Sequence, residues 1–84
     1  MLTFDPDKDA VNVVKHGISL ARAADIEGMI VELDVRFTSE TRYRGWGTID
    51  GLPYCLAFTL RGDNEVRAIS LRRAHLTEYE RHAS

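Results

Sequence analysis

The sequence predicts an α+β fold in which two N-terminal helices pack on a four-stranded antiparallel meander sheet, with a short C-terminal helix after it. Three observations lead to this prediction: two helix-start signals lie in the first 28 residues, the apolar period changes from helical to two at Met29, and turn signals then separate four strand-like runs. A chain of 84 residues has material for one small core, so residues 1–84 are expected to form a single domain.

Both N-terminal helices are predicted from their end signals. Asp5 can accept hydrogen bonds from the first-turn amides, and Pro6 suits the first helical position. Gly17 stands where a left-handed cap would end this helix. Ser19 is the expected N-cap of a second, shorter helix over residues 20–26.

Alternation of apolar and polar residues predicts the strands, which in chain order are 29–37, 42–49, 54–61 and 65–73. The run from Met29 to Phe37 alternates most clearly, and its apolar residues are expected to face the core. Asp50-Gly51 is a strong hairpin signal, and a last helix is expected from His75 to about His82. The helices should cover a face made by Val31, Leu33, Tyr54, Leu56, Phe58, Ile69 and Leu71.

Composition and charge exclude several classes of protein. The net charge of −2 argues against a generic nucleic-acid binder, yet residues 42–84 carry seven cations, all arginine, against five acids. One cysteine cannot form an internal disulfide, and no apolar run reaches the ~20 residues that cross a bilayer. The N-terminus lacks the pattern of a signal peptide, so a cytoplasmic protein with no membrane partner is expected.

The other face of the predicted sheet is expected to form a shallow polar groove around the small residues Cys55, Ala57 and Ala68. Its polar members are Arg44, Trp46, Thr59, Arg61, Ser70 and Arg72. Arginine binds phosphate with two parallel hydrogen bonds, and a tryptophan can stack a nucleic-acid base. Alternatively, the face is polar because solvent covers it, and Trp46 belongs to a small core under the C-terminal helix.

His16 also has two interpretations. An imidazole titrates near neutral pH, so His16 can be a general acid-base group with Lys15 offsetting phosphate charge. It can equally be a helix-end histidine that bonds the last carbonyls. The three histidines lie far apart in the sequence, and Cys55 has no cysteine partner, so no metal is expected. The chain has no glycine-rich phosphate loop followed by a helix, and no cofactor is expected.

Taken together, a set of residues that runs nearly end to end resembles the BrnT family of bacterial ribonuclease toxins. The set is Phe4-Asp5, Lys8, Asn12, Lys15–Leu20, Glu40, Arg42, Gly47, Gly51, Arg61-Gly62, Arg67, Ile69–Ala74 and Glu78. Its most specific parts are the Lys-His-Gly-Ile-Ser-Leu corner at residues 15–20 and the Arg-Ala-Ile-Ser-Leu-Arg strand at residues 67–72.

The resemblance implies a RelE-like fold, a role in a type II toxin-antitoxin system, and RNA cleavage that inhibits translation without a metal or cofactor. It further implies a ribbon-helix-helix antitoxin of the BrnA type that neutralises the toxin, and contact with promoter DNA only through the toxin-antitoxin complex. The antitoxin is expected to cover the helix-free sheet face or its rim.

Cleavage in this class is attack of a ribose 2′-hydroxyl on the neighbouring phosphate. The implied catalytic residues are Lys15, His16, Arg61 and Arg72, and the implied substrate-binding residues are Arg44, Trp46, Arg67, Ser70 and Arg73. One alternative is a catalytically weak or silent interaction module that retains antitoxin binding and promoter co-regulation. A DNA-binding domain acting alone is disfavoured, because Lys8 and Lys15 stand seven residues apart among acidic and neutral residues and no helix carries a basic recognition face.

Overall fold

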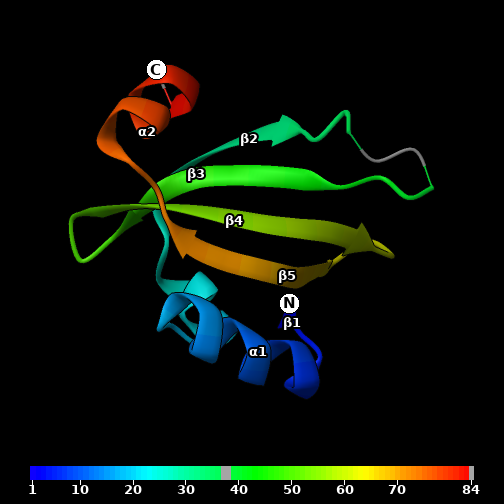
Figure 1. Cartoon of the computed structure of the whole chain (residues 1–84). Helices are drawn as coiled ribbons and strands as arrows, with labels where there is room; N and C mark the ends of the chain where they lie inside the picture. Colours follow the sequence, from blue (N-terminus) through cyan, green and yellow to red (C-terminus); the bar gives the residue numbers. More distant parts are fainter. Residues whose placement is uncertain (37–38, 84) are drawn as a thin grey trace.

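The computed structural model describes residues 1–36 and 39–83, and its five strands form one sheet in the order β1-β5-β4-β3-β2 (Figure 1). The elements are β1 (Leu2–Thr3), α1 (Pro6–His16), the 3-10 helix η1 (Leu20–Asp25), β2 (Glu27–Leu33), β3 (Tyr43–Ile49), β4 (Leu52–Arg61), β5 (Glu65–Arg73) and α2 (Leu76–Ala83). β1 runs parallel to β5, and the other neighbours are antiparallel. η1 packs on one sheet face, α2 packs on the other, and α1 lies along β5 (Figure 1).

The predicted fold is wrong in its sheet and in its helices. The sheet is mixed and has five strands, because Leu2-Thr3 adds to β5 in parallel, and a two-residue strand is too short to show alternation. The predicted second helix is a six-residue 3-10 helix that ends where Ile26 turns extended. Ser19 caps it as predicted, accepting a hydrogen bond from the Ala21 amide at 3.1 Å. Before β2, the described residues form a single α-helix, α1.

The predicted ends of the first helix and the predicted hairpin turn are confirmed. The Asp5 carboxylate accepts a hydrogen bond from the Asp7 amide at 2.8 Å, and Gly17 ends α1 with a φ of 72°. Asp50 and Gly51 have φ of 52° and 78°, which is the conformation that a two-residue hairpin requires.

β2 is an edge strand, which overturns part of the predicted core. Val31 and Leu33 are 47% and 54% exposed, so the helices do not cover them. The alternation of apolar and polar residues correctly predicted a strand here. Its apolar face is not buried, because the helices packed on the sheet do not extend over this edge strand. The predicted strand end at Phe37 lies outside the described residues.

β5 contains a bulge at Ile69. Ser70 pairs with Ala57 while Ala68 pairs with Phe58, so Ile69 has no partner in the β4–β5 ladder. The prediction that Ile69 belongs to the core is therefore wrong, and Ala68, 1% exposed, takes that place. The extra residue also shifts the alternation for the rest of the strand.

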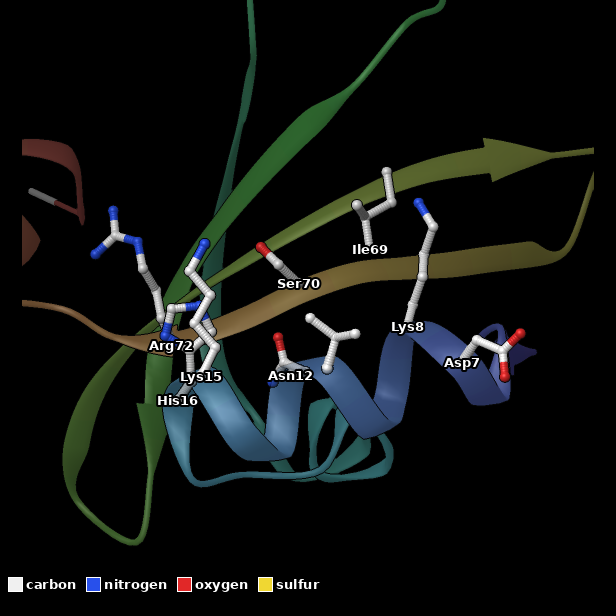
Figure 2. A pocket seen from close by; sticks show the side chains of 9 residues that line it. Asp7, Lys8, Asn12, Lys15, His16, Ile69, Ser70 and Arg72 are labelled. Atoms are coloured by element: carbon white, nitrogen blue, oxygen red, sulfur yellow. The ribbon is translucent and has the colours of Figure 1, made fainter.

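Asn12 fastens α1 to the open edge of β5 (Figure 2). Its Oδ1 accepts a hydrogen bond from the Leu71 amide at 3.0 Å, and its Nδ2 donates to the Leu71 carbonyl at 2.9 Å. Nδ2 also donates to the Ile18 carbonyl at 2.8 Å, and the side chain is buried. Because β1 pairs only with residues 66–67 of β5, the Asn12 amide replaces the missing strand neighbour farther along.

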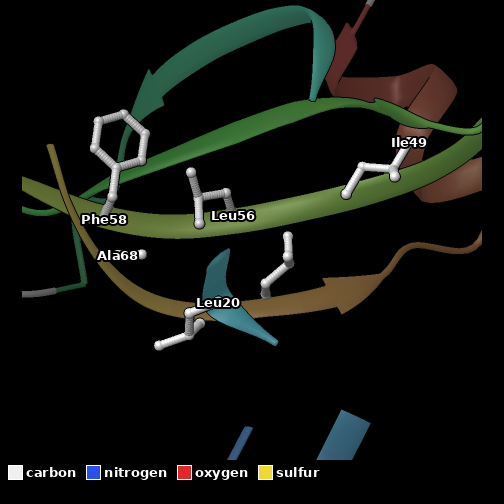
Figure 3. Close-up of a cluster of buried hydrophobic side chains, with 6 residues drawn as sticks. Leu20, Ile49, Leu56, Phe58 and Ala68 are labelled. Carbon is white, nitrogen blue, oxygen red and sulfur yellow. The ribbon is translucent and has the colours of Figure 1, made fainter. Parts of the chain in front are cut away.

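The main core lies between η1 and the sheet (Figure 3). Its buried members are Leu20, Ile49, Leu56, Phe58, Ala68 and Leu71. Leu20, from η1, is fully buried, and burial of such a side chain contributes roughly 1.5–3 kcal/mol. A second, smaller core lies under α2 and contains Trp46, Cys55 and Ala74.

We predict that Asn12→Ala lowers the free energy of unfolding by about 2–3 kcal/mol, because it leaves the buried amide and carbonyl of Leu71 without partners. Urea denaturation measures the loss. The matched control is Asn64→Ala in the exposed β4–β5 turn, which should change stability by less than about 0.5 kcal/mol. Equal losses in the two variants would contradict this role of Asn12.

Acid should weaken the fold through Asp34. Its buried carboxylate accepts hydrogen bonds from Arg36 Nε at 2.9 Å and Nη2 at 2.8 Å, and these bonds lower its pKa from 3.8 to about 2. Since the pKa is lower in the folded protein, the stabilisation is complete above about pH 4 and is lost as the pH falls toward 2. Urea titrations between pH 5 and 2 should show a shallower fall in Asp34→Asn than in wild type; identical curves would refute the assignment.

Candidate functional site

A cavity of about 520 Å³ lies between α1 and β5 (Figure 2). It is lined by Asp7, Lys8, Val11, Asn12, Lys15, His16, Ile69, Ser70 and Arg72. The cavity therefore lies where the Asn12 bridge holds the helix against the strand edge. The polar groove expected over the middle of the sheet is displaced to this edge, because α2 covers part of the face on which it was predicted.

The periodicity of the helix and the bulge of the strand determine which side chains face this cavity. Lys8 and Lys15 are two helical turns apart, so they share one face of α1, and both side chains extend to the same side of β5 as the Ser70 hydroxyl (Figure 2). In the strand register, Ser70 lies opposite Ala57 and Arg72 lies opposite Cys55. Ser70 and Arg72 therefore lie on the same sheet face.

The electrostatics around His16 favour a neutral imidazole. His16 is the last residue of α1, and partial burial lowers its pKa below the usual 6.5. The positive charges of Lys15 and Arg72 lower the pKa further, because both oppose protonation of the ring. A neutral imidazole between two cations can accept a proton next to a bound anion.

Arg72 is held in a fixed orientation by α2. Its Nη1 and Nη2 donate to the two carboxylate oxygens of Glu78 at 2.9 and 3.1 Å, and its guanidinium carbon lies 5.8 Å from the centre of the Trp46 ring. The hydrogen bond to Glu78 raises the pKa of Arg72, and the same contact lowers the pKa of Glu78. Glu78 is not among the site residues predicted from the sequence. Its place on the C-terminal helix, six residues after Arg72, is the signal that could have identified it.

A second cavity, of about 250 Å³, holds Arg61 and Arg67. Its lining is Asp5, Lys8, Glu40, Thr59, Arg61, Arg67, Ala68 and Ile69. Of the predicted catalytic residues, the structure brings Lys15, His16 and Arg72 together around the first cavity. It separates Arg61 from them, since Arg61 lines only the second cavity.

Trp46 offers no exposed surface to a ligand. It is fully buried under α2, where its ring stacks on His82 with centroids 4.4 Å apart. Its Nε1 donates to Glu32 Oε1 at 3.1 Å. The structure thus places Trp46 in the small core beneath the C-terminal helix, which was the alternative interpretation of this residue.

Arg44 and Arg73 line neither cavity. Arg44 forms an ion pair with Glu32 at 2.9 Å and lies beside the small core under α2. Arg73 lies with its guanidinium carbon 5.7 Å from the Tyr54 ring centre, on the sheet face that carries the main core.

Three further features of the described residues concern metal ligands, the cysteine and membrane-spanning helices. No group of three or more histidine, cysteine or acidic side chains within residues 1–36 and 39–83 could hold a metal ion. Burial raises the pKa of the Cys55 thiol to about 11, so this group is protonated at neutral pH. Among the described helices, none has the length and apolarity that crossing a membrane requires.

Comparisons with known proteins identify the family of this chain. Residues 4–78 match the family model described as the ribonuclease toxin BrnT of type II toxin-antitoxin systems. The 1.1 Å crystal structure of the Brucella abortus ribonuclease toxin BrnT has a similar fold, with a TM-score of 0.73 and 22% sequence identity over 88% of this chain and 95% of that chain. The search of curated protein sequences finds no match. Because the family model covers most of the 84 residues, the chain belongs to the BrnT family of ribonuclease toxins.

Proposed function

We propose that this protein is a metal-independent endoribonuclease that cleaves RNA in the cavity between α1 and β5. The main support for the proposal is that one cavity is lined by His16, Lys15, Ser70 and Arg72. Cleavage of a phosphodiester by the neighbouring ribose hydroxyl needs a proton acceptor, a proton donor and positive charge at the phosphate, and these side chains can supply all three.

In the proposed reaction, neutral His16 accepts the proton of the ribose 2′-hydroxyl. The 2′ oxygen then forms a bond to the adjacent phosphorus, and the bond from phosphorus to the 5′ oxygen breaks. The leaving oxygen takes up a proton, for which we propose the Lys15 ammonium as the donor, and the proton on His16 later returns to Lys15. The products are a 2′,3′-cyclic phosphate and a 5′-hydroxyl, so atoms and charge balance without a metal.

Arg72 is proposed to stabilise the negative charge that builds on the phosphate. A guanidinium does so by donating two parallel hydrogen bonds to two phosphate oxygens. Glu78 and the Trp46 ring hold this side chain in place before substrate binds, which reduces the reorganisation needed in the transition state. Ser70 can donate one further hydrogen bond to the same phosphate from the neighbouring position on β5.

The second candidate function is a weak or silent module that binds its antitoxin but cleaves little. One observation favours it: the Glu78 carboxylate already occupies the fork of Arg72, at 2.9 and 3.1 Å. A phosphate would have to share or displace that contact. Measured cleavage rates distinguish the two functions directly.

We further propose that a ribbon-helix-helix antitoxin neutralises this protein and that promoter DNA is contacted through their complex. Among the described residues, η1 lies on one face of the sheet and α2 on the other, so the helix-free face that was expected to receive the partner is not found there. The rim remains available at β2, where Ile30, Val31 and Leu33 are about half exposed. Crosslinks that avoid this strand would remove it from the proposed interface.

Arg72→Ala should lower the rate of RNA cleavage by about 10²–10³-fold, as expected for loss of one preorganised donor to the transition-state charge. The assay uses purified protein, end-labelled RNA and EDTA, with the product ends identified. Circular dichroism shows whether the variant is folded. Arg22→Gln is the control of equal charge change, because Arg22 pairs with Asp25 and Asp50 and lines neither cavity. A folded Arg72→Ala protein that cleaves as fast as wild type would disprove the role of Arg72.

The imidazole of His16 should titrate with a midpoint below 6.5, because burial, Lys15 and Arg72 all disfavour its charged form. Cleavage should therefore fall in acid only below that pH, as the base becomes protonated. NMR of the ring protons measures the midpoint, and a His16→Ala sample identifies the resonance. Lys15→Gln should raise the midpoint, because it removes one of the opposing charges. A wild-type midpoint at or above 6.5 would be incompatible with the proposed base.

A further inference from the structure

We infer that the RNA site extends beyond the cleavage centre along α1 into the second cavity, and that Lys8 binds a phosphate of the RNA strand there. The inference rests on the proposed function for the nature of the ligand. Its geometric basis is independent: Lys8 and Ile69 line both cavities, so the two hollows adjoin at these residues.

The spacing along α1 suits a strand that passes from one cavity to the next. Lys8 and Lys15 are seven residues apart, which corresponds to roughly 10 Å along a helix axis. Both side chains rise to the same side of β5 (Figure 2). With a rise of about 3.4 Å per stacked nucleotide, this separation spans roughly three nucleotides. Lys15 can thus face the scissile phosphate while Lys8 faces another one.

The charges of the second cavity favour an anionic ligand. Lys8 and Arg61 form no ion pair with any described residue, and Arg67 makes only a long one, with its Nη1 4.0 Å from Glu65. By contrast, Arg72 lies within 2.9 Å of a carboxylate oxygen.

The two carboxylates in the same lining already have donors. Asp5 accepts a hydrogen bond from the Asp7 amide at 2.8 Å, and Glu40 accepts one from Arg42 Nε at 2.7 Å. The lining of this cavity therefore carries three cations against two carboxylates, and each of these carboxylates already accepts a hydrogen bond from outside the three cations. A polyanion that reaches from the first cavity supplies the matching charge.

Binding of RNA that cannot be cleaved tests the inference separately from catalysis. The probes are a dinucleotide and an octanucleotide, both 2′-O-methylated so that no 2′-hydroxyl can attack, and affinity is measured by fluorescence anisotropy at several salt concentrations. Lys8→Ala should raise the Kd of the octanucleotide about five- to tenfold. It should also make the slope of log affinity against log salt shallower by about 0.7, the value for one phosphate contact on a single strand. The dinucleotide, which is too short to reach the second cavity, should bind unchanged.

Two variants control for charge and folding. Lys8→Arg should keep most of the affinity because it keeps the cation. Arg22→Gln removes the same charge at a residue outside both cavities and should leave the octanucleotide Kd and salt slope unchanged.

An unchanged octanucleotide Kd in folded Lys8→Ala would overturn the inference, whatever the effect of this substitution on antitoxin binding. Equal weakening of the dinucleotide would also overturn it, because Lys8 would then belong to the cleavage centre. Cleavage of the unmodified octanucleotide by the wild-type protein is measured alongside, so that failure of the extended site and failure of the ribonuclease proposal can be told apart. Lys8-dependent binding without any cleavage by wild type would refute the ribonuclease proposal and leave the extended site intact.

Discussion

The pairing of the Asn12 side-chain amide with both peptide groups of Leu71 is the constraint on which the site depends. A sheet edge needs partners for its amides and carbonyls, and β1 supplies them only at the start of β5. Asn12 supplies them at Leu71 and, through Ile18, also fixes the turn after α1. Because these bonds are buried, they set the distance between helix and strand, and hence the width of the cavity that lies between them.

Local charge explains how a chain with a net charge of −2 can carry the proposed site for a polyanion. Carboxylates hold several arginines in place: Asp25 and Asp50 bind Arg22, and Glu32 binds Arg44. Cations without such partners gather where α1 faces β5. The bulge at Ile69 brings Ser70 and Arg72 to the face that the cavity opens on, and among the described residues Arg72, unlike the two lysines, pairs with a carboxylate, that of Glu78. The net charge alone therefore does not argue against the proposed RNA ligand.

Features set by neighbouring residues could be predicted from the sequence, and features set by distant contacts could not. The ends of α1 and the Asp50-Gly51 hairpin follow from the conformations of a few adjacent residues. The family could be recognised because its most specific motifs are short runs of consecutive residues. The bulge, the parallel strand β1 and the burial of Trp46 depend on partners far along the chain. For the same reason the site was expected over the sheet, whereas Lys15 and His16 lie beside Arg72 at its edge. The seven-residue spacing of Lys8 and Lys15 can be read from the sequence. That both lysines face β5 across a cavity cannot, because this depends on the packing of α1 against the strand.

RNA binding between α1 and β5 underlies both proposals. NMR of isotope-labelled protein titrated with a non-cleavable, 2′-O-methylated octanucleotide tests this binding site, because every backbone amide reports on its own surroundings. We expect the largest shift changes in residues 8–17 of α1 and its cap and in residues 67–72 of β5, with little change in β2. Shift changes confined to β2 or to the outer surface of α2, with α1 unaffected, would contradict it.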